Sequence, residues 1–122
     1  MSLALVLHDL CKLLRDGGQV EPQAWPPLEE QLFERTAALQ DRLGNEVAAT
    51  GLPVLSELLQ EATSDFREAI VALKLAFQED GPELASWIQE RVQNADETLR
   101  RVRQLLLEYS AMLCEEDQLG DL

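Results

Sequence analysis

The chain has 122 residues, of which 46% are apolar, and its formal net charge is −13. This length suits one domain, and the apolar content is too high for a disordered chain. The negative charge disfavours nucleic acid and anionic membranes as partners, because the protein would repel their phosphate groups. No apolar run approaches the roughly 20 residues that span a bilayer, so we do not expect membrane insertion.

The first apolar residues, Leu3 to Leu14, have the spacing of a short helix with a wide apolar face. Gly17-Gly18 ends this helix, because glycine readily takes the left-handed conformation that a helix stop needs. No basic segment precedes these residues and no small-residue cleavage site follows them. We therefore expect no signal peptide and a cytoplasmic protein.

A loop is predicted over residues 19–27, which include three prolines and Trp25. Prolines fix φ and lack a hydrogen-bond donor, so this stretch is expected to be extended or turning. Two interpretations of Trp25 stay open. The side chain either fixes the loop onto the bundle, which we favour, or presents an aromatic anchor to a partner.

A second helix is predicted from about Pro27, with an apolar face that advances by three or four residues. Gly44-Asn45 interrupts this pattern, so the helix either ends there or continues to Thr50. We favour continuation, because Gly51 offers a better helix stop. The residues on the predicted face are Leu32, Thr36, Leu39, Leu43 and Val47.

Two longer helices are predicted in the remainder, from near Pro53 to about Asp80 and from Pro82 to about Glu115. Their apolar positions alternate steps of three and four residues, the period that keeps one stripe against a partner helix. Trp87 lies at the edge of the second stripe, which predicts core packing. The stripes are Leu55, Leu59, Ala62, Phe66, Ala69, Leu73 and Phe77 or Ala76, and then Leu84, Ile88, Val92, Ala95, Leu99, Val102, Leu106, Tyr109 and Leu113.

Together these elements predict an all-α fold in one domain over residues 1–122. The expected architecture is a four-helix antiparallel bundle with a short first helix and two long coiled-coil-like C-terminal helices. Residues 117–122 are expected to form a frayed acidic tail, because acids oppose the dipole at a helix C-terminus. At 1.5 Å per residue the last helix spans about 50 Å, more than a compact domain of this size needs.

No residue pattern in the chain predicts catalysis, a metal site or a cofactor. His8 is the one histidine, and a Cys–His pair with Cys11 lacks an orienting group. Cys11 and Cys114 are expected to be reduced thiols, with a disulfide as the alternative. The acids along the third helix are interpreted as a solvated face that lacks the pattern of a calcium-binding loop. These acids are Glu57, Glu61, Asp65 and Glu68.

The C-terminal half of the last helix is the predicted partner-binding surface. The short first helix can cover only part of this long helix, so apolar residues near its end should be exposed, and exposed apolar stripes mark interaction sites. Three arginines on the polar side either pair with nearby acids, which we favour, or bind an acidic partner or a second copy. The predicted surface comprises Trp25, Val102, Leu106, Tyr109, Leu113, Arg100, Arg101 and Arg103.

The leading hypothesis is a non-enzymatic helical protein–protein interaction module, such as an adaptor, a regulator or a chaperone. It would bind an amphipathic helix of a protein partner or form a homodimer. Chaperones that hold export substrates of flagellar and type III secretion systems are similar in size, acidity and helical layout, and no motif identifies that family. The alternatives are a small-molecule- or metal-binding helical bundle, which needs convergent polar groups inside the bundle, and a structural component that forms large assemblies.

Overall fold

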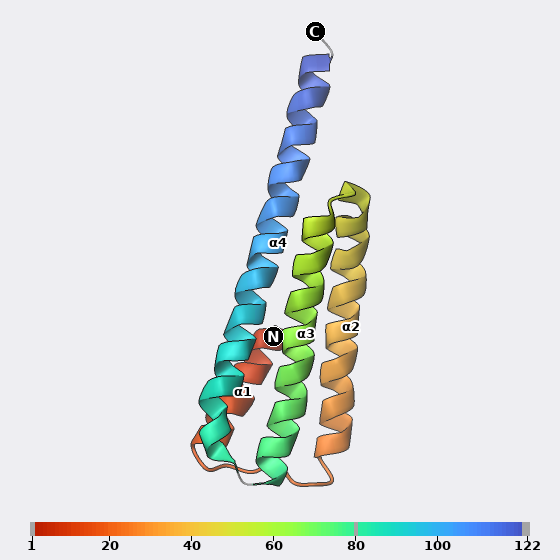
Figure 1. The fold of residues 1–122 in the computed structure, drawn as a ribbon. Helices are drawn as coiled ribbons and strands as arrows, with labels where there is room; N and C mark the ends of the chain where they lie inside the picture. The colour runs from red at the N-terminus through yellow and green to blue at the C-terminus, as the bar shows by residue number, and fades with distance from the viewer. Residues whose placement is uncertain (1, 80, 121–122) are drawn as a thin grey trace.

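The structure is a computed structural model that describes residues 2–79 and 81–120, with side chains described as far as Leu113. Within these residues the chain forms four α-helices and one short 3-10 helix. The elements are α1 (Leu3–Arg15), α2 (Trp25–Thr50), α3 (Pro53–Gln78), η1 (Pro82–Leu84) and α4 (Ala85–Gly120). Helices α1 and α3 run in one direction and α2 and α4 in the other, so the predicted antiparallel bundle is confirmed (Figure 1).

The core follows the predicted three-four stripe of α3, which packs against both α2 and α4. Phe66, Ile70 and Leu73 are fully buried on α3, as are Ile88 and Val92 on α4. Each remaining residue of the predicted α3 stripe is also buried, and Ala76, not Phe77, takes its last position. The stripe is continuous because side chains three and four residues apart lie on the same face of a helix.

Helix α2 is continuous through Gly44, as predicted, and ends at Gly51. Gly51 has φ 67°, a left-handed conformation that glycine adopts without steric cost. The helix begins at Trp25, two residues earlier than expected. Pro26 and Pro27 lie in its first turn, where a missing N–H leaves no helical hydrogen bond unmade. The predicted loop therefore stops at residue 24.

The two tryptophans differ in burial. Trp25 is 4% exposed, and its ring centroid lies 5.9 Å from that of Phe77, so it fixes the start of α2 onto α3. Trp87 is 45% exposed with the Arg91 guanidinium 5.1 Å from its ring, so the predicted core packing is wrong. Position 87 is rotated about 100° from the buried Ile88, which turns it toward solvent. Leu84 is also exposed, because it lies in η1, before the regular turns of α4.

Helix α4 is longer than the helices that surround it. Figure 1 shows that it continues past the connection between α2 and α3, whereas α1 lies beside its lower half alone. The helix extends to Gly120, and the fraying expected from Asp117 stays a prediction. Residues 121 and 122 lie outside the described part of the chain. Among the described residues, none of the helices has the length and apolarity that a membrane crossing requires.

Candidate partner-binding groove

A groove between α2 and α4 begins where α1 begins. Its lower part, about 460 Å³, is bounded by Ser2 and Leu3 and has Phe66 of α3 in its lining. Its upper part, about 780 Å³, extends to Thr50 on α2 and Leu113 on α4. Arg42 and Arg103 line both parts, so the two parts adjoin at these residues, and together they are called here the α2–α4 groove. The groove is open because α1 is too short to cover this face of the bundle.

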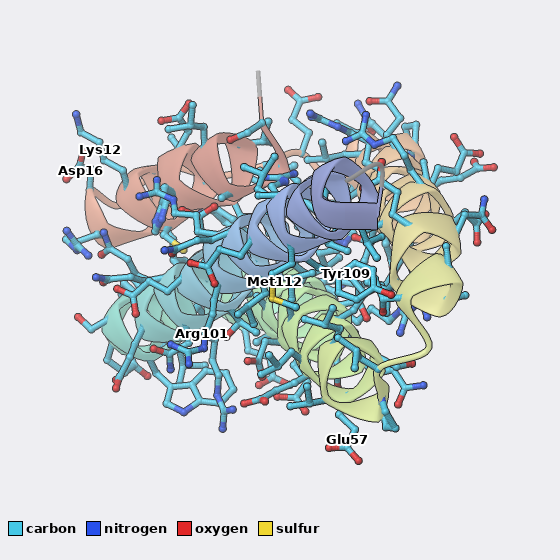
Figure 2. All side chains as sticks on the ribbon, turned by 90° about the horizontal axis from the view of Figure 1, so that it is seen from above. Lys12, Asp16, Glu57, Arg101, Tyr109 and Met112 are labelled. Carbon is cyan, nitrogen blue, oxygen red and sulfur yellow. The ribbon has the colours of Figure 1, made fainter. Side chains whose placement is uncertain are left out.

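Four of the predicted partner-binding residues, Arg103 among them, line the upper part of the groove. Leu106 and Tyr109 are half-buried, and Leu113 is 44% exposed. In Figure 2, Tyr109 points toward the side of α4 where α2 and α3 lie. Val102 is 0% exposed and belongs to the core, so its predicted role at the surface is wrong. The exposed stripe starts beyond Val102, because the other helices still pack around α4 at that level.

Two exposed apolar residues in this region were not predicted. Leu107 is 72% exposed and lines the groove, and Met112 is 55% exposed. Both lie off the three-four stripe, so a search for core positions passes over them. The run of three leucines at 105–107 is the signal that predicts a wider apolar face, because consecutive residues cover about 200° of a helix.

The three predicted arginines do not form one cluster in the structure. Arg100 pairs with Asp96, with 3.1 Å between Nη2 and Oδ2, which confirms the favoured interpretation for this residue. Arg101 points away from α2 (Figure 2). Arg103 lies in the groove, where α2 contributes Arg35 and Arg42. The sequence separates Arg35 and Arg42 from Arg103 by some sixty residues, so the packing of α2 beside α4 brings this basic cluster together.

Trp25 lies outside the groove, because it is buried at the opposite end of α2. Its indole N–H lacks a hydrogen-bond partner within the described residues. The ring is covered by Phe77 and the preceding loop, which leaves no aromatic surface for a partner. The favoured interpretation, in which Trp25 fixes the loop, is therefore confirmed.

His8 and Cys11 lie on α1, on the side that packs into the bundle. Cys11 is a free thiol with 0% exposure. Burial raises its pKa to about 11, and Arg15 opposes this rise. A thiol with such a pKa is protonated near neutral pH and is a weak nucleophile. The side chain of Cys114 lies outside the described residues.

The acids of α3 take part in contacts with α4. Arg91 Nη1 lies 3.4 Å from Asp65 Oδ1 and 3.7 Å from Glu68 Oε2. Burial raises the pKa of Asp65, Arg91 opposes this rise, and the acids Glu68 and Glu61 add to it. No group of three or more metal-binding side chains occurs among residues 2–79 and 81–113. Asp65 and Glu68 connect two helices, whereas Glu57 and Glu61 are exposed on α3, as a solvated face predicts.

Comparisons with protein-family models, with curated proteins and with solved structures found no match to this chain. The groove itself is therefore the feature from which a function can be inferred. It combines an apolar lining, basic side chains at its centre and an opening as long as several helical turns. Such a surface suits a helix that presents both apolar and acidic groups.

Proposed function

We propose that this protein is a non-enzymatic protein–protein interaction module that holds an amphipathic helix in the α2–α4 groove. Such a surface suits an adaptor, a regulator or a chaperone of the kind that holds export substrates. The observation that carries the proposal is the exposure of large apolar side chains where the bundle lacks a covering helix. Leu107 is 72% exposed and Leu113 is 44% exposed, and both line this groove.

The groove supports a helix more strongly than it supports a small molecule. It is a long, open channel between two parallel helices, whereas small-molecule sites are enclosed and bury most of the ligand. An amphipathic helix fits such a channel through apolar residues three and four positions apart. Arg42 and Arg103 lie on opposite helices along it, where they would contact acidic residues of the bound helix.

The cysteine chemistry supports a proposal for the compartment. A free thiol at Cys11, buried in the core, suits a reducing environment. We therefore propose that the protein acts in the cytoplasm. This part of the proposal is tested by fractionation of the source cells with an antibody against the protein.

Site-specific photo-cross-linking tests the groove. Benzoylphenylalanine replaces Leu107 in one variant and Arg101 in a matched control, because Arg101 lies on the same helix and points away from α2. Each variant is expressed in the source cells, and the cross-linked segment is mapped by mass spectrometry. We expect strong cross-linking from position 107 to one amphipathic helix and little from position 101. Equal cross-linking from both positions, or none, would contradict the proposal.

A synthetic peptide of the mapped segment then gives the affinity directly. Its binding should weaken at least about tenfold in Leu113→Asp, because an apolar contact becomes a buried charge. The control Arg101→Glu should bind with unchanged affinity. A peptide that binds both variants equally well would show that the groove is not its site.

A further inference from the structure

We infer that the helix bound in the α2–α4 groove is the C-terminal part of α4 from a second copy of this chain, in antiparallel orientation. The inference rests on the proposed function and names the partner of the same groove. Two copies related by a two-fold axis would each place the end of α4 in the groove of the other. One contact would then cover both surfaces that the monomer leaves exposed.

The apolar surface of α4 is not fully covered in the monomer. The end of α4 extends past α2 and α3 (Figure 1), so a monomer leaves both this end and the neighbouring groove uncovered. Leu107, Met112 and Leu113 are 72%, 55% and 44% exposed. Leu107 and Leu113 also line the groove, so one set of side chains forms both the surface that needs covering and the surface that can cover it. A two-fold interface requires such a self-complementary patch.

The groove and the end of α4 match in length. On α4 the groove extends from Asp96 to Leu113, which is about 26 Å at 1.5 Å per residue. The part of α4 from Arg103 to Gly120 is helical and has the same length. One end of α4 therefore matches the groove of another copy, and no further helix is needed to fill it.

The centre of the groove and the end of α4 carry opposite charges in the sequence. The chain has a net charge of −13, yet arginines line the centre of the groove. Neither Arg42 nor Arg103 has an ion-pair partner within residues 2–79 and 81–113. The sequence of α4 has three consecutive acids at positions 115–117. In a second copy these acids would add negative charge opposite Arg42 and Arg103, beyond that of Glu46 and Asp96 in the groove lining.

Charge also selects the orientation. Along α4, Arg103 and the acids at 115–117 lie on either side of Tyr109, which is the centre of the apolar segment 105–113. An antiparallel pair centred near Tyr109 places the bases of each copy at the level of the acids of the other. A parallel pair places acids beside acids, which is repulsive. The segment 105–113 would form the apolar centre of the contact in both copies.

Oligomeric state measured by light scattering and analytical ultracentrifugation tests the inference. We expect the full chain to be a dimer at about 100 µM and to dissociate on dilution. Leu107→Asp should raise the dissociation constant at least about tenfold. Arg101→Glu should leave it unchanged, because Arg101 points away from α2 (Figure 2). A monomeric full chain at about 100 µM would overturn the inference.

Charge reversal with rescue tests the pairing. Arg42→Glu with Arg103→Glu should weaken the dimer about tenfold, and Glu115→Arg with Glu116→Arg should do the same. The variant with all four changes should recover most of the affinity, because attraction is restored with inverted signs. Far-UV circular dichroism confirms that each variant is folded. A folded variant with all four substitutions that associates no better than the variants with two substitutions would overturn the proposed pairing.

Disulfide trapping tests the orientation in a Cys114→Ser background. The substitution Ser110→Cys should allow a disulfide between two copies, because this position lies near the proposed two-fold axis. The substitution Arg103→Cys should not give a disulfide between copies. Antiparallel packing separates position 103 of one copy from position 103 of the other by roughly 20 Å at 1.5 Å per residue. Linking at both positions would show parallel helices and overturn the inference.

The cross-linking experiment at Leu107 separates this inference from the proposed function. A cross-link to the end of α4 from another copy supports both. A monomeric protein that cross-links to a helix of a different protein overturns the inference and leaves the proposed function standing. A monomeric protein with no cross-link at position 107 overturns both.

Discussion

Alanine substitutions at Val102 and Leu107 separate the core from the groove. The two residues lie on the same helix, and their exposures are 0% and 72%. Val102→Ala removes two buried carbon atoms, which costs about 1.6 kcal/mol in transfer free energy at about 0.8 kcal/mol each. The cavity left behind raises the loss of unfolding free energy to about 2–3 kcal/mol. Leu107→Ala should change the unfolding free energy of the monomer by less than about 0.5 kcal/mol.

Thermal unfolding followed by far-UV circular dichroism measures both effects. For a domain of this size a loss of 1 kcal/mol lowers Tm by about 4 °C, so Val102→Ala should lower it by about 8–12 °C. Measurement at about 2 µM reports on the monomer, and measurement at about 200 µM includes the dimer. The Tm of the natural chain should rise between these concentrations, and that of Leu107→Ala should rise less.

The Tm of Leu107→Ala at the lower concentration decides between an open and a closed groove. If Leu107→Ala lowered Tm at the lower concentration as much as Val102→Ala does, Leu107 would belong to the core of the monomer. The groove would then be closed within one chain, and both the proposed function and the dimer would lose their main support. Circular dichroism of the folded baseline serves as the control for helix content in each variant.

Three further predictions concern the bundle itself. Gly44→Ala should stabilise the protein by about 0.5–1 kcal/mol, because the helix continues through this position and the added Cβ would have a nearest contact of 3.9 Å. Gly51→Ala should lower the unfolding free energy by about 1 kcal/mol, because φ is 67° at this position. Urea unfolding measures the effect of both glycine substitutions. A Gly44→Ala variant less stable than the natural chain would contradict a continuous α2. Trp25→Ala should lower the unfolding free energy by about 3–5 kcal/mol, and Trp87→Ala by less than about 1 kcal/mol. Acrylamide should quench the fluorescence of the exposed Trp87 more than that of the buried Trp25. Burial raises the pKa of Cys11 from 9.0 to about 11. The thiol of the unfolded chain therefore ionises first as pH rises. The contribution of Cys11 to the unfolding free energy should be complete below pH 9.0 and be lost as pH rises toward 11. Iodoacetamide labelling at neutral pH should be slow at this thiol, and Cys11→Ala should remove this part of the pH dependence.

The arginines show why the site was harder to predict than the fold. Arg100, Arg101 and Arg103 are neighbours in the sequence, yet consecutive residues of a helix point in different directions. The structure leaves Arg103 in the groove and pairs Arg100 with Asp96. The second arginine at the centre of the groove, Arg42, comes from α2. No pattern within one helix indicates which residues of another helix will lie beside it.

The sequence by itself determined the elements of this protein. The three-four spacing from Leu55 to Ala76 dictates the buried face of α3, and the glycines and prolines set where the helices end, because these effects depend on neighbours along the chain. Only the tertiary structure decided which part of α4 is uncovered. Val102 is buried and Leu113 is 44% exposed, although both lie on the same stripe of α4, because of how far α1, α2 and α3 extend along this helix. That length mismatch is a relation between separate helices, so it is fixed by their packing and not by the spacing within any one of them.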